Sequence, residues 1–168
     1  MAMENNRGSQ LTTQVKQQAA LLAAFVAIIW ATEIVDWLIF GGGLDVLGIQ
    51  PRTVSGLRGI VLAPFLHGNF AHLAANTVPF LVLGGVILLR DRRHFWPVTL
   101  IVALISGLGT WLIGPRNSVH IGASGIIFGY FGFLLLYGYY RRSLTAVLLS
   151  LVIFFFYGGM LWGVLPGQ

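Results

Sequence analysis

The chain has 168 residues, of which 57% are hydrophobic and only 9% are charged. Soluble domains carry about 25% charged residues, so this composition excludes a soluble domain and indicates an integral membrane protein. The formal net charge of +5 is typical of basic loops beside a membrane and not of nucleic-acid binding, because the aromatic residues stand inside apolar runs. The chain has no cysteine, which excludes disulfides, zinc–cysteine sites and thiol chemistry.

Five apolar segments follow a polar start, and each is close to the roughly 20 residues that a transmembrane helix needs. Residues 1–18 are predicted to be a frayed polar tail because they show no periodic pattern, and residues 19–168 are predicted to be one transmembrane domain. The sequence therefore predicts an all-α polytopic membrane protein, a bundle of five transmembrane helices. The predicted spans cover residues 19–40, 69–89, 95–113, 121–140 and 144–164.

Basic residues orient these spans, because cytoplasmic loops carry an excess of Lys and Arg. An N-terminus in the cytoplasm places seven basic residues inside and three outside. The inner set is Arg7, Lys16, Arg90, Arg92, Arg93, Arg141 and Arg142, and the outer set is Arg52, Arg58 and Arg116. We therefore expect a cytoplasmic N-terminus. The polar start lacks the character of an organellar leader, which favours a prokaryotic plasma membrane.

Two of the predicted spans place polar groups at a similar membrane depth. At about 1.5 Å per helical residue, Ser124 lies roughly 26 Å from the inner boundary of its span, His72 roughly 27 Å and Asn76 roughly 21 Å from theirs. His72 and Asn76 are four residues apart, so they share one helix face. Polar groups at membrane depth are costly and usually functional. We therefore expect the three side chains to face a shared, water-accessible cleft.

Two interpretations of this cluster stay open. A serine becomes a nucleophile when a base takes its proton and N–H donors stabilise the oxyanion. His72, Asn76 and a backbone amide in the first turn of a helix are suitable donors. Alternatively, Ser124 and Gly125 are helix-packing residues, because Gly125-x-x-x-Gly129 fits a close helix contact. The histidines are then interhelical hydrogen-bonding groups.

Other polar residues lead to weaker predictions. Glu33 and Asp36 stand near the outer end of the first span, where we expect them to pair with Arg58 or with outer-loop backbone. Substrate gating or proton transfer is the alternative for these two carboxylates. A metal site built from His67, His72 and a carboxylate is disfavoured because the histidines are five residues apart, off the helical i, i+4 spacing. Neither a metal nor a cofactor is predicted.

The polar motifs resemble those of a known family. Residues 63–76, Ala-Pro-Phe-Leu-His-Gly-Asn-Phe-Ala-His-Leu-Ala-Ala-Asn, resemble the second helix of rhomboid intramembrane serine proteases, whose pattern is His, four residues, His, three residues, Asn. Residues 121–129, Ile-Gly-Ala-Ser-Gly-Ile-Ile-Phe-Gly, resemble the family's Gly-x-Ser-x nucleophile segment. The two motifs stand in the family's order, one helix apart, and the resemblance covers roughly residues 19–168.

This resemblance implies a rhomboid-like helix bundle that hydrolyses peptide bonds of transmembrane protein substrates. Ser124 would be the nucleophile, and His72 and Asn76 would line the oxyanion hole. Leu57 stands where the family usually has an aromatic residue before its structural loop arginine, which weakens the match of the loop. The supporting residues that the resemblance implies are His67 near the mouth of the site, Gly122 in the nucleophile turn, Gly125, and Arg58 as the loop arginine.

The general base is where the chain departs from the family. In rhomboid proteases the base is a histidine on a sixth helix, whereas this sequence has no histidine after His120. His72 is assigned to the oxyanion hole, and His120 is predicted to make loop or capping hydrogen bonds. We therefore interpret the sequence as a rhomboid truncated before its sixth helix. A naturally shortened, inactive relative is the alternative.

Three functions from different classes are compatible with these residues. The first is a rhomboid protease that cuts transmembrane substrates near the outer membrane face. The second is an inactive rhomboid-like protein that binds transmembrane helices without cleaving them. The third is a polytopic scaffold or transporter fragment whose polar cluster packs or passes protons. The lipid bilayer is an expected partner and nucleic acid is not, and the oligomeric state is not predicted.

Overall fold

The computed structural model describes residues 2–90, 92–140, 142 and 144–157, and these residues are almost entirely helical. The long helices are α1 (Ala2–Val35), α3 (Phe70–Arg90), α4 (Arg92–Ile113), α5 (Ser124–Tyr140) and α6 (Leu144–Tyr157). The short helical elements are η1 (Asp36–Phe40), η2 (Gly43–Leu47), η3 (Ser55–Arg58), α2 (Gly59–Leu62) and η4 (Ala63–Phe65). The predicted all-α class is thus confirmed.

Among the described residues, three segments are long and apolar enough to cross a membrane: Val15–Phe40, Phe70–Arg90 and Arg92–Ile113. They correspond to the first three predicted spans. Helix α5 covers the fourth predicted span with 17 residues, slightly fewer than the roughly 20 that a perpendicular span requires. Helix α6 covers residues 144–157 of the fifth, and residues 158–164 of that prediction lie outside the described part of the chain.

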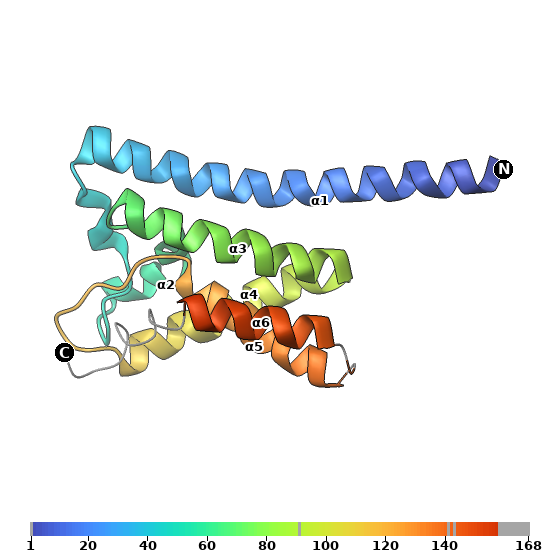
Figure 1. Ribbon diagram of the computed structural model, residues 1–168. Coiled ribbons are helices and arrows are strands. Elements are labelled where there is room, and N and C mark those ends of the chain that lie inside the picture. The colour runs from blue at the N-terminus through green and yellow to red at the C-terminus, as the bar shows by residue number, and fades with distance from the viewer. Residues whose placement is uncertain (1, 91, 141, 143, 158–168) are drawn as a thin grey trace.

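The polar N-terminal segment differs from its prediction. Helix α1 begins at Ala2 and runs through Val35 without interruption, so the described residues of the predicted tail are helical and not frayed. In Figure 1 the N-terminal end of this helix extends past the ends of the other helices. A helix forms its backbone hydrogen bonds within itself. The absence of periodic apolar residues at positions 2–18 therefore did not predict the absence of a helix.

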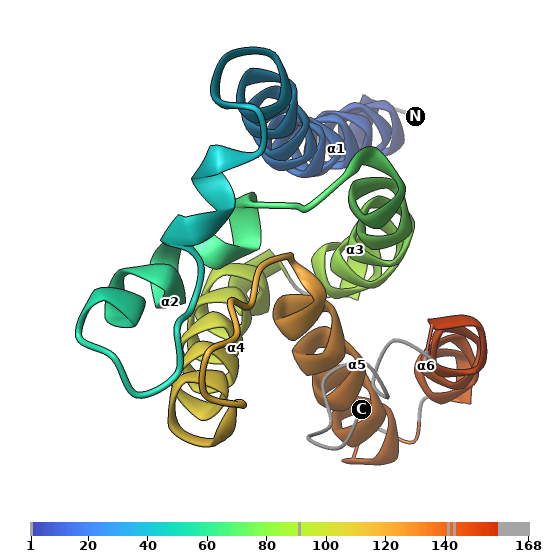
Figure 2. The same ribbon diagram turned by 90° about the vertical axis from the view of Figure 1, so that its left-hand side faces the viewer.

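Helices α3 and α5 form the centre of the bundle. Helix α3 contacts α1, α4 and α5, and α5 also contacts α4 and α6; Figure 2 shows α1 beside α3, and α5 between α4 and α6. Tyr130 is fully buried between α3 and α4, and its hydroxyl lies 2.6 Å from the Thr99 hydroxyl. Burying a hydroxyl without a partner is costly, so this pair fixes the rotation of α5 against α4. The packed core comprises Leu22, Phe80, Leu83, Ile87, Leu88, Phe95, Ala123, Ile126, Ile127, Tyr130 and Leu134.

The segment before α5 is held by the loop that joins α1 to α3. Ile49 and His120 exchange two backbone hydrogen bonds of 2.9 Å each, and the Gly122 N–H donates to the Ala63 carbonyl over 2.8 Å. Buried backbone groups need partners, and these bonds supply partners for a segment that has no helical hydrogen bonds of its own. The loop therefore positions the start of α5.

Arg52 attaches the same loop to the end of α4. Its Nη1 donates to the Leu112 carbonyl over 2.9 Å and its Nη2 to the Gly114 carbonyl over 2.8 Å. The Trp111 indole N–H in turn donates to the Thr53 carbonyl over 2.8 Å. The last four carbonyls of a helix lack intrahelical donors, so the guanidinium satisfies groups that would otherwise depend on water.

We expect Arg52→Gln to lower the free energy of unfolding by about 1–2 kcal/mol, because two hydrogen bonds from a charged donor are lost. Arg58→Gln is the matched control: it removes an exposed arginine from the same loop, for which the described residues show no hydrogen bond or ion pair. Thermal unfolding of both variants in detergent measures the difference. Equal melting temperatures for the two variants would contradict the role of Arg52 in attaching the loop to α4.

Candidate functional site

Ser124 is the first residue of α5, and the two residues before it set its position. Gly122 has φ +106°, a backbone conformation that L side chains rarely adopt and that glycine tolerates. Ala123 is fully buried, and its carbonyl accepts the first backbone hydrogen bonds of the helix, from Ile126 and Ile127. The sequence Gly-Ala-Ser thus makes a tight entry into α5 that leaves the serine side chain at the helix start.

His72 and Asn76 approach this entry from α3. A Cβ atom built on Gly122 would lie 2.9 Å from Cε1 and Nε2 of His72 and 3.7 Å from Nδ2 of Asn76. Asn76 is fully buried and donates to the His72 carbonyl over 3.0 Å, while its Oδ1 has no partner among the described residues. Both side chains therefore lie against the backbone two residues ahead of Ser124.

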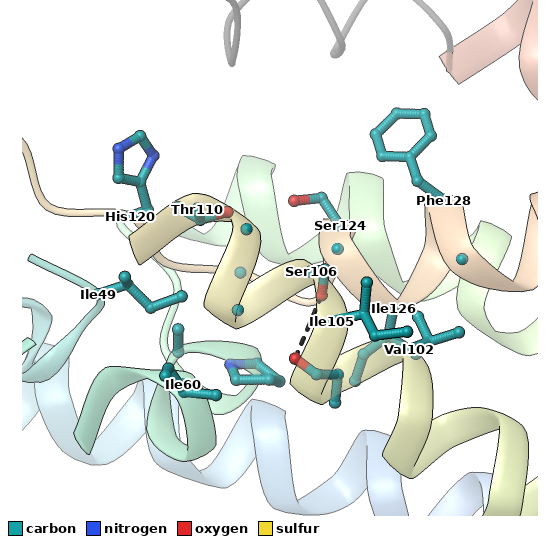
Figure 3. A pocket seen from close by; sticks show the side chains of 18 of the residues that line it. Ile49, Ile60, Val102, Ile105, Ser106, Thr110, His120, Ser124, Ile126 and Phe128 are labelled. Atoms are coloured by element: carbon teal, nitrogen blue, oxygen red, sulfur yellow. Dashed lines mark hydrogen bonds between the residues drawn. The ribbon is translucent and has the colours of Figure 1, made fainter. Parts of the chain in front are cut away.

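Ser124 itself lines a cavity of about 450 Å³ between α4, α5 and the loop that precedes α3. The polar side chains of this cavity are Ser106, Thr110, His120 and Ser124, and the other lining residues are apolar or glycine. In Figure 3 the Ser124 and His120 side chains project to the same side of the pocket, with Thr110 between them. His72 and Asn76 are not among its lining residues. The described residues therefore bring the predicted elements together, but they do not form one cleft lined by all three predicted side chains.

His67 is buried beside His72. It is 1% exposed, the two imidazole centroids are 5.1 Å apart, and neither of its nitrogens has a hydrogen-bond partner among the described residues. Burial, and next the neighbouring imidazole of His72, lower the pKa of His67 from 6.5 to about 4. The ring is therefore neutral at neutral pH. It supports His72 by contact and not by a direct hydrogen bond.

His120 lies in the loop between α4 and α5, where it was predicted to lie. Its Nε2 is 2.8 Å from the Ser118 hydroxyl, and its backbone pairs with Ile49. Burial lowers the pKa of His120 below its usual value, so the neutral ring is favoured. The expected loop hydrogen bonding of this histidine is confirmed.

Gly125 and Gly129 are the contact surface of α5 toward α4. A Cβ atom at Gly125 would lie 2.7 Å from the Ser106 Oγ, and one at Gly129 would overlap the Val102 side chain. The small-residue spacing Gly125-x-x-x-Gly129 therefore serves close helix packing, as the structural interpretation of these glycines predicted. This contact fixes the distance between the serine helix and the wall of the cavity.

The acidic residues of the first span do not meet Arg58. Glu33 and Asp36 are 5% and 3% exposed, and no ion pair from either is found in the described residues. Asp36 Oδ1 instead accepts a 3.0 Å hydrogen bond from the Leu44 N–H, and the Glu33 carboxylate lies against the backbone N–H of His67. The predicted pairing with Arg58 is wrong, and the alternative pairing with outer-loop backbone is confirmed for Asp36. Arg58 is exposed.

Arg52 is the residue that the sequence argument missed. It anchors the loop in the way that the resemblance assigned to Arg58. A signal was present in the sequence, because Trp111 and the Gly114-Pro115 turn mark a helix end whose carbonyls need donors. That signal does not say which of two loop arginines reaches them. In the described part of the chain no group of three or more His, Asp or Glu side chains could hold a metal ion.

Comparison with known proteins places this site in a family. The model of the rhomboid domain matches residues 55–168. An uncharacterized protein of Mycobacterium tuberculosis is 45% identical over 150 residues, which are 86% of this chain and 62% of that protein. An uncharacterized protein of Mycobacterium leprae is 38% identical over 174 residues, covering 97% and 68% of the two chains. A Bacillus subtilis protein named as a candidate rhomboid protease is 28% identical over 144 residues, 80% of this chain and 72% of its own. No solved structure matches the chain. The chain spans about 62% of the length of the M. tuberculosis relative.

We expect Gly122→Ala to destabilise the protein by about 1–3 kcal/mol, because it forces a side chain into a positive-φ conformation and against the His72 imidazole. Gly132→Ala is the matched control within α5, since a Cβ atom there would meet nothing within 4 Å and alanine favours the helix. Thermal unfolding measures both. A Gly122→Ala protein as stable as the control would contradict the close approach.

The buried His67 predicts how stability depends on pH. In the unfolded chain the imidazole takes a proton near pH 6.5, whereas the folded protein holds it neutral down to about pH 4. Between these values the unfolded state binds more protons, so stability falls as the pH falls. We expect the melting temperature to drop from pH 7 to pH 5, and to drop less in His67→Gln. An equal drop in both proteins would show that other groups cause the effect.

Proposed function

The chain belongs to the rhomboid family, and from that premise we propose that it is an intramembrane serine protease with Ser124 as its nucleophile. The observation that carries the proposal is the close approach of His72 and Asn76 to Gly122, two residues before the serine. Polar side chains at membrane depth are costly. If this position served helix packing alone, small residues would be sufficient. Helix packing therefore does not explain why the His72 imidazole and the Asn76 amide lie against the turn before Ser124.

The proposed reaction is an acyl transfer to the serine followed by hydrolysis. The Ser124 Oγ attacks a peptide carbonyl of a transmembrane substrate, and a base takes the hydroxyl proton. The oxyanion receives hydrogen bonds from the His72 ring N–H and from the second amide hydrogen of Asn76, the first being donated to the His72 carbonyl. The amine product leaves with a proton, and water then releases the acid product and restores the serine.

The base is assigned by resemblance and not by contact. Within the described residues no histidine forms a hydrogen bond with the Ser124 hydroxyl, and among the chain's four histidines only His120 lines the serine's cavity. His120 is already paired with Ser118. The resemblance to rhomboid proteases assigns this role to a histidine on a sixth helix, and no histidine of the described residues takes its place.

A second candidate function is favoured by the observation that no histidine of the described residues forms a hydrogen bond with the Ser124 hydroxyl. A serine without a base is a weak nucleophile, and a rhomboid-like chain in that state would bind transmembrane helices without cutting them. The two functions share a fold and a client class, and they differ only in the reactivity of one hydroxyl. A direct measurement of that reactivity separates them.

We expect a fluorophosphonate probe to label the protein, expressed from its complete reading frame, at Ser124. Ser124→Ala should abolish the labelling. His72→Ala should reduce its rate about 100-fold, because removing one oxyanion donor from a serine hydrolase has about this effect. Ser106→Ala is the matched control, since Ser106 lines the same cavity and should leave labelling unchanged. Labelled protein is detected by in-gel fluorescence and the site by mass spectrometry.

The outcomes decide between the two functions. Labelling that survives Ser124→Ala, or that never occurs, would contradict the protease. Co-purification of single-span membrane proteins in the unlabelled case would then establish the binding function. We also propose a plasma-membrane location with the N-terminus in the cytoplasm, which the excess of basic residues at one end of the bundle supports.

A further inference from the structure

A second cavity lies far from the serine, at the end of the bundle where α3 stops and α4 begins. It has a volume of about 360 Å³ and is lined from α1, α3 and α4. Its lining residues are Gln17, Gln18, Leu21, Leu88, Arg92, Phe95 and Trp96. Polar and apolar side chains thus meet in one hollow, an arrangement suited to a ligand with a polar head and apolar chains.

The polar side of the cavity keeps free donor capacity. The Gln18 side-chain amide donates one hydrogen bond of 3.1 Å to the Leu88 carbonyl. Arg92 Nη1 donates a 3.4 Å hydrogen bond to the Gln17 side-chain oxygen. A guanidinium has five N–H donors, and this long contact uses one of the five in Arg92. Arg92 is exposed and lies at the rim of the hollow, where its planar fork suits the oxygens of a phosphate.

The charge around the cavity is positive. Lys16 precedes the two glutamines on α1, Arg93 follows Arg92 on α4, and Arg90 ends α3, while Asp91 is the single acidic residue in this part of the sequence. Clusters of Lys and Arg beside a transmembrane helix attract anionic lipids by about 1 kcal/mol for each basic residue near the surface. The partner that this charge favours is therefore an anion at the membrane surface.

The apolar side of the cavity continues along α4. Trp96, Leu100 and Leu104 are 51%, 58% and 50% exposed and follow one another at helical spacing of four residues, so they form one stripe down the helix. Trp96 both lines the cavity and begins the stripe. An indole at this height is typical of the membrane interface. The stripe is a path for acyl chains that start at the cavity.

We propose that this cavity binds one anionic glycerophospholipid, with its phosphodiester on Arg92 and its acyl chains along Trp96, Leu100 and Leu104. The lipid fills the space between the middle of α1 and the start of α4. The inference does not depend on the proposed protease activity, because none of these residues belongs to the serine site.

Native mass spectrometry of the detergent-purified chain tests this inference by titration with phosphatidylglycerol and, separately, phosphatidylcholine. We expect one phosphatidylglycerol to bind about fivefold or more tightly than phosphatidylcholine, and Arg92→Gln to remove about fivefold of that affinity. Arg92→Lys should retain most of it. Arg142→Gln is the matched control, a basic residue that does not line the cavity, and should bind like the parent protein.

A second variant covers the case in which Arg92→Gln does not fold. Gln17→Glu places a negative charge on an exposed residue of α1 inside the cavity and should weaken phosphatidylglycerol binding without removing a packing group. Equal binding of the two lipids, or an equal loss in Arg142→Gln, would overturn the proposal. Competition by inorganic phosphate at millimolar concentration would do so as well, because it would show a free-anion site and not a lipid site.

Discussion

The close approach of α3 and α5 at Gly122 is the constraint on which the site depends. No side chain fits between the His72 imidazole and this backbone, and the positive φ of Gly122 excludes most L residues independently. Glycine tolerates both conditions because it has no Cβ. The contact determines how far α5 stands from α3, and so it brings the segment just before Ser124 against the half-buried His72 and the fully buried Asn76.

The loop between α1 and α3 forms hydrogen bonds to several other parts of the structure. It supplies the carbonyl for the Gly122 N–H, the partner of the His120 backbone, and the guanidinium at the end of α4. Irregular backbone that is buried needs hydrogen-bond partners for its polar groups. The loop meets this condition through hydrogen bonds to the segment before Ser124. The same hydrogen bonds therefore stabilise the loop and position the site.

The two ends of the bundle have different chemistry. At the end that holds the site, Glu33 and Asp36 are buried and their partners are backbone groups. At the other end, arginines, glutamines and an exposed indole surround a hollow that opens toward the surroundings. Buried polar groups make their environment rigid when they are satisfied, whereas exposed cations interact with mobile lipid headgroups. The division fits a rigid site at one membrane face and a lipid contact at the other.

The sequence by itself determined the class and the first three spans, because apolar length is a local property of the chain. The expected fraying of the N-terminal segment was wrong, since its described residues are helical. Tertiary structure alone decided which arginine anchors the loop, where the carboxylates find partners, and that the serine's cavity faces α4 while His72 and Asn76 face Gly122. These depend on side-chain reach across helices, and residue spacing along one helix carries no information about distances to another.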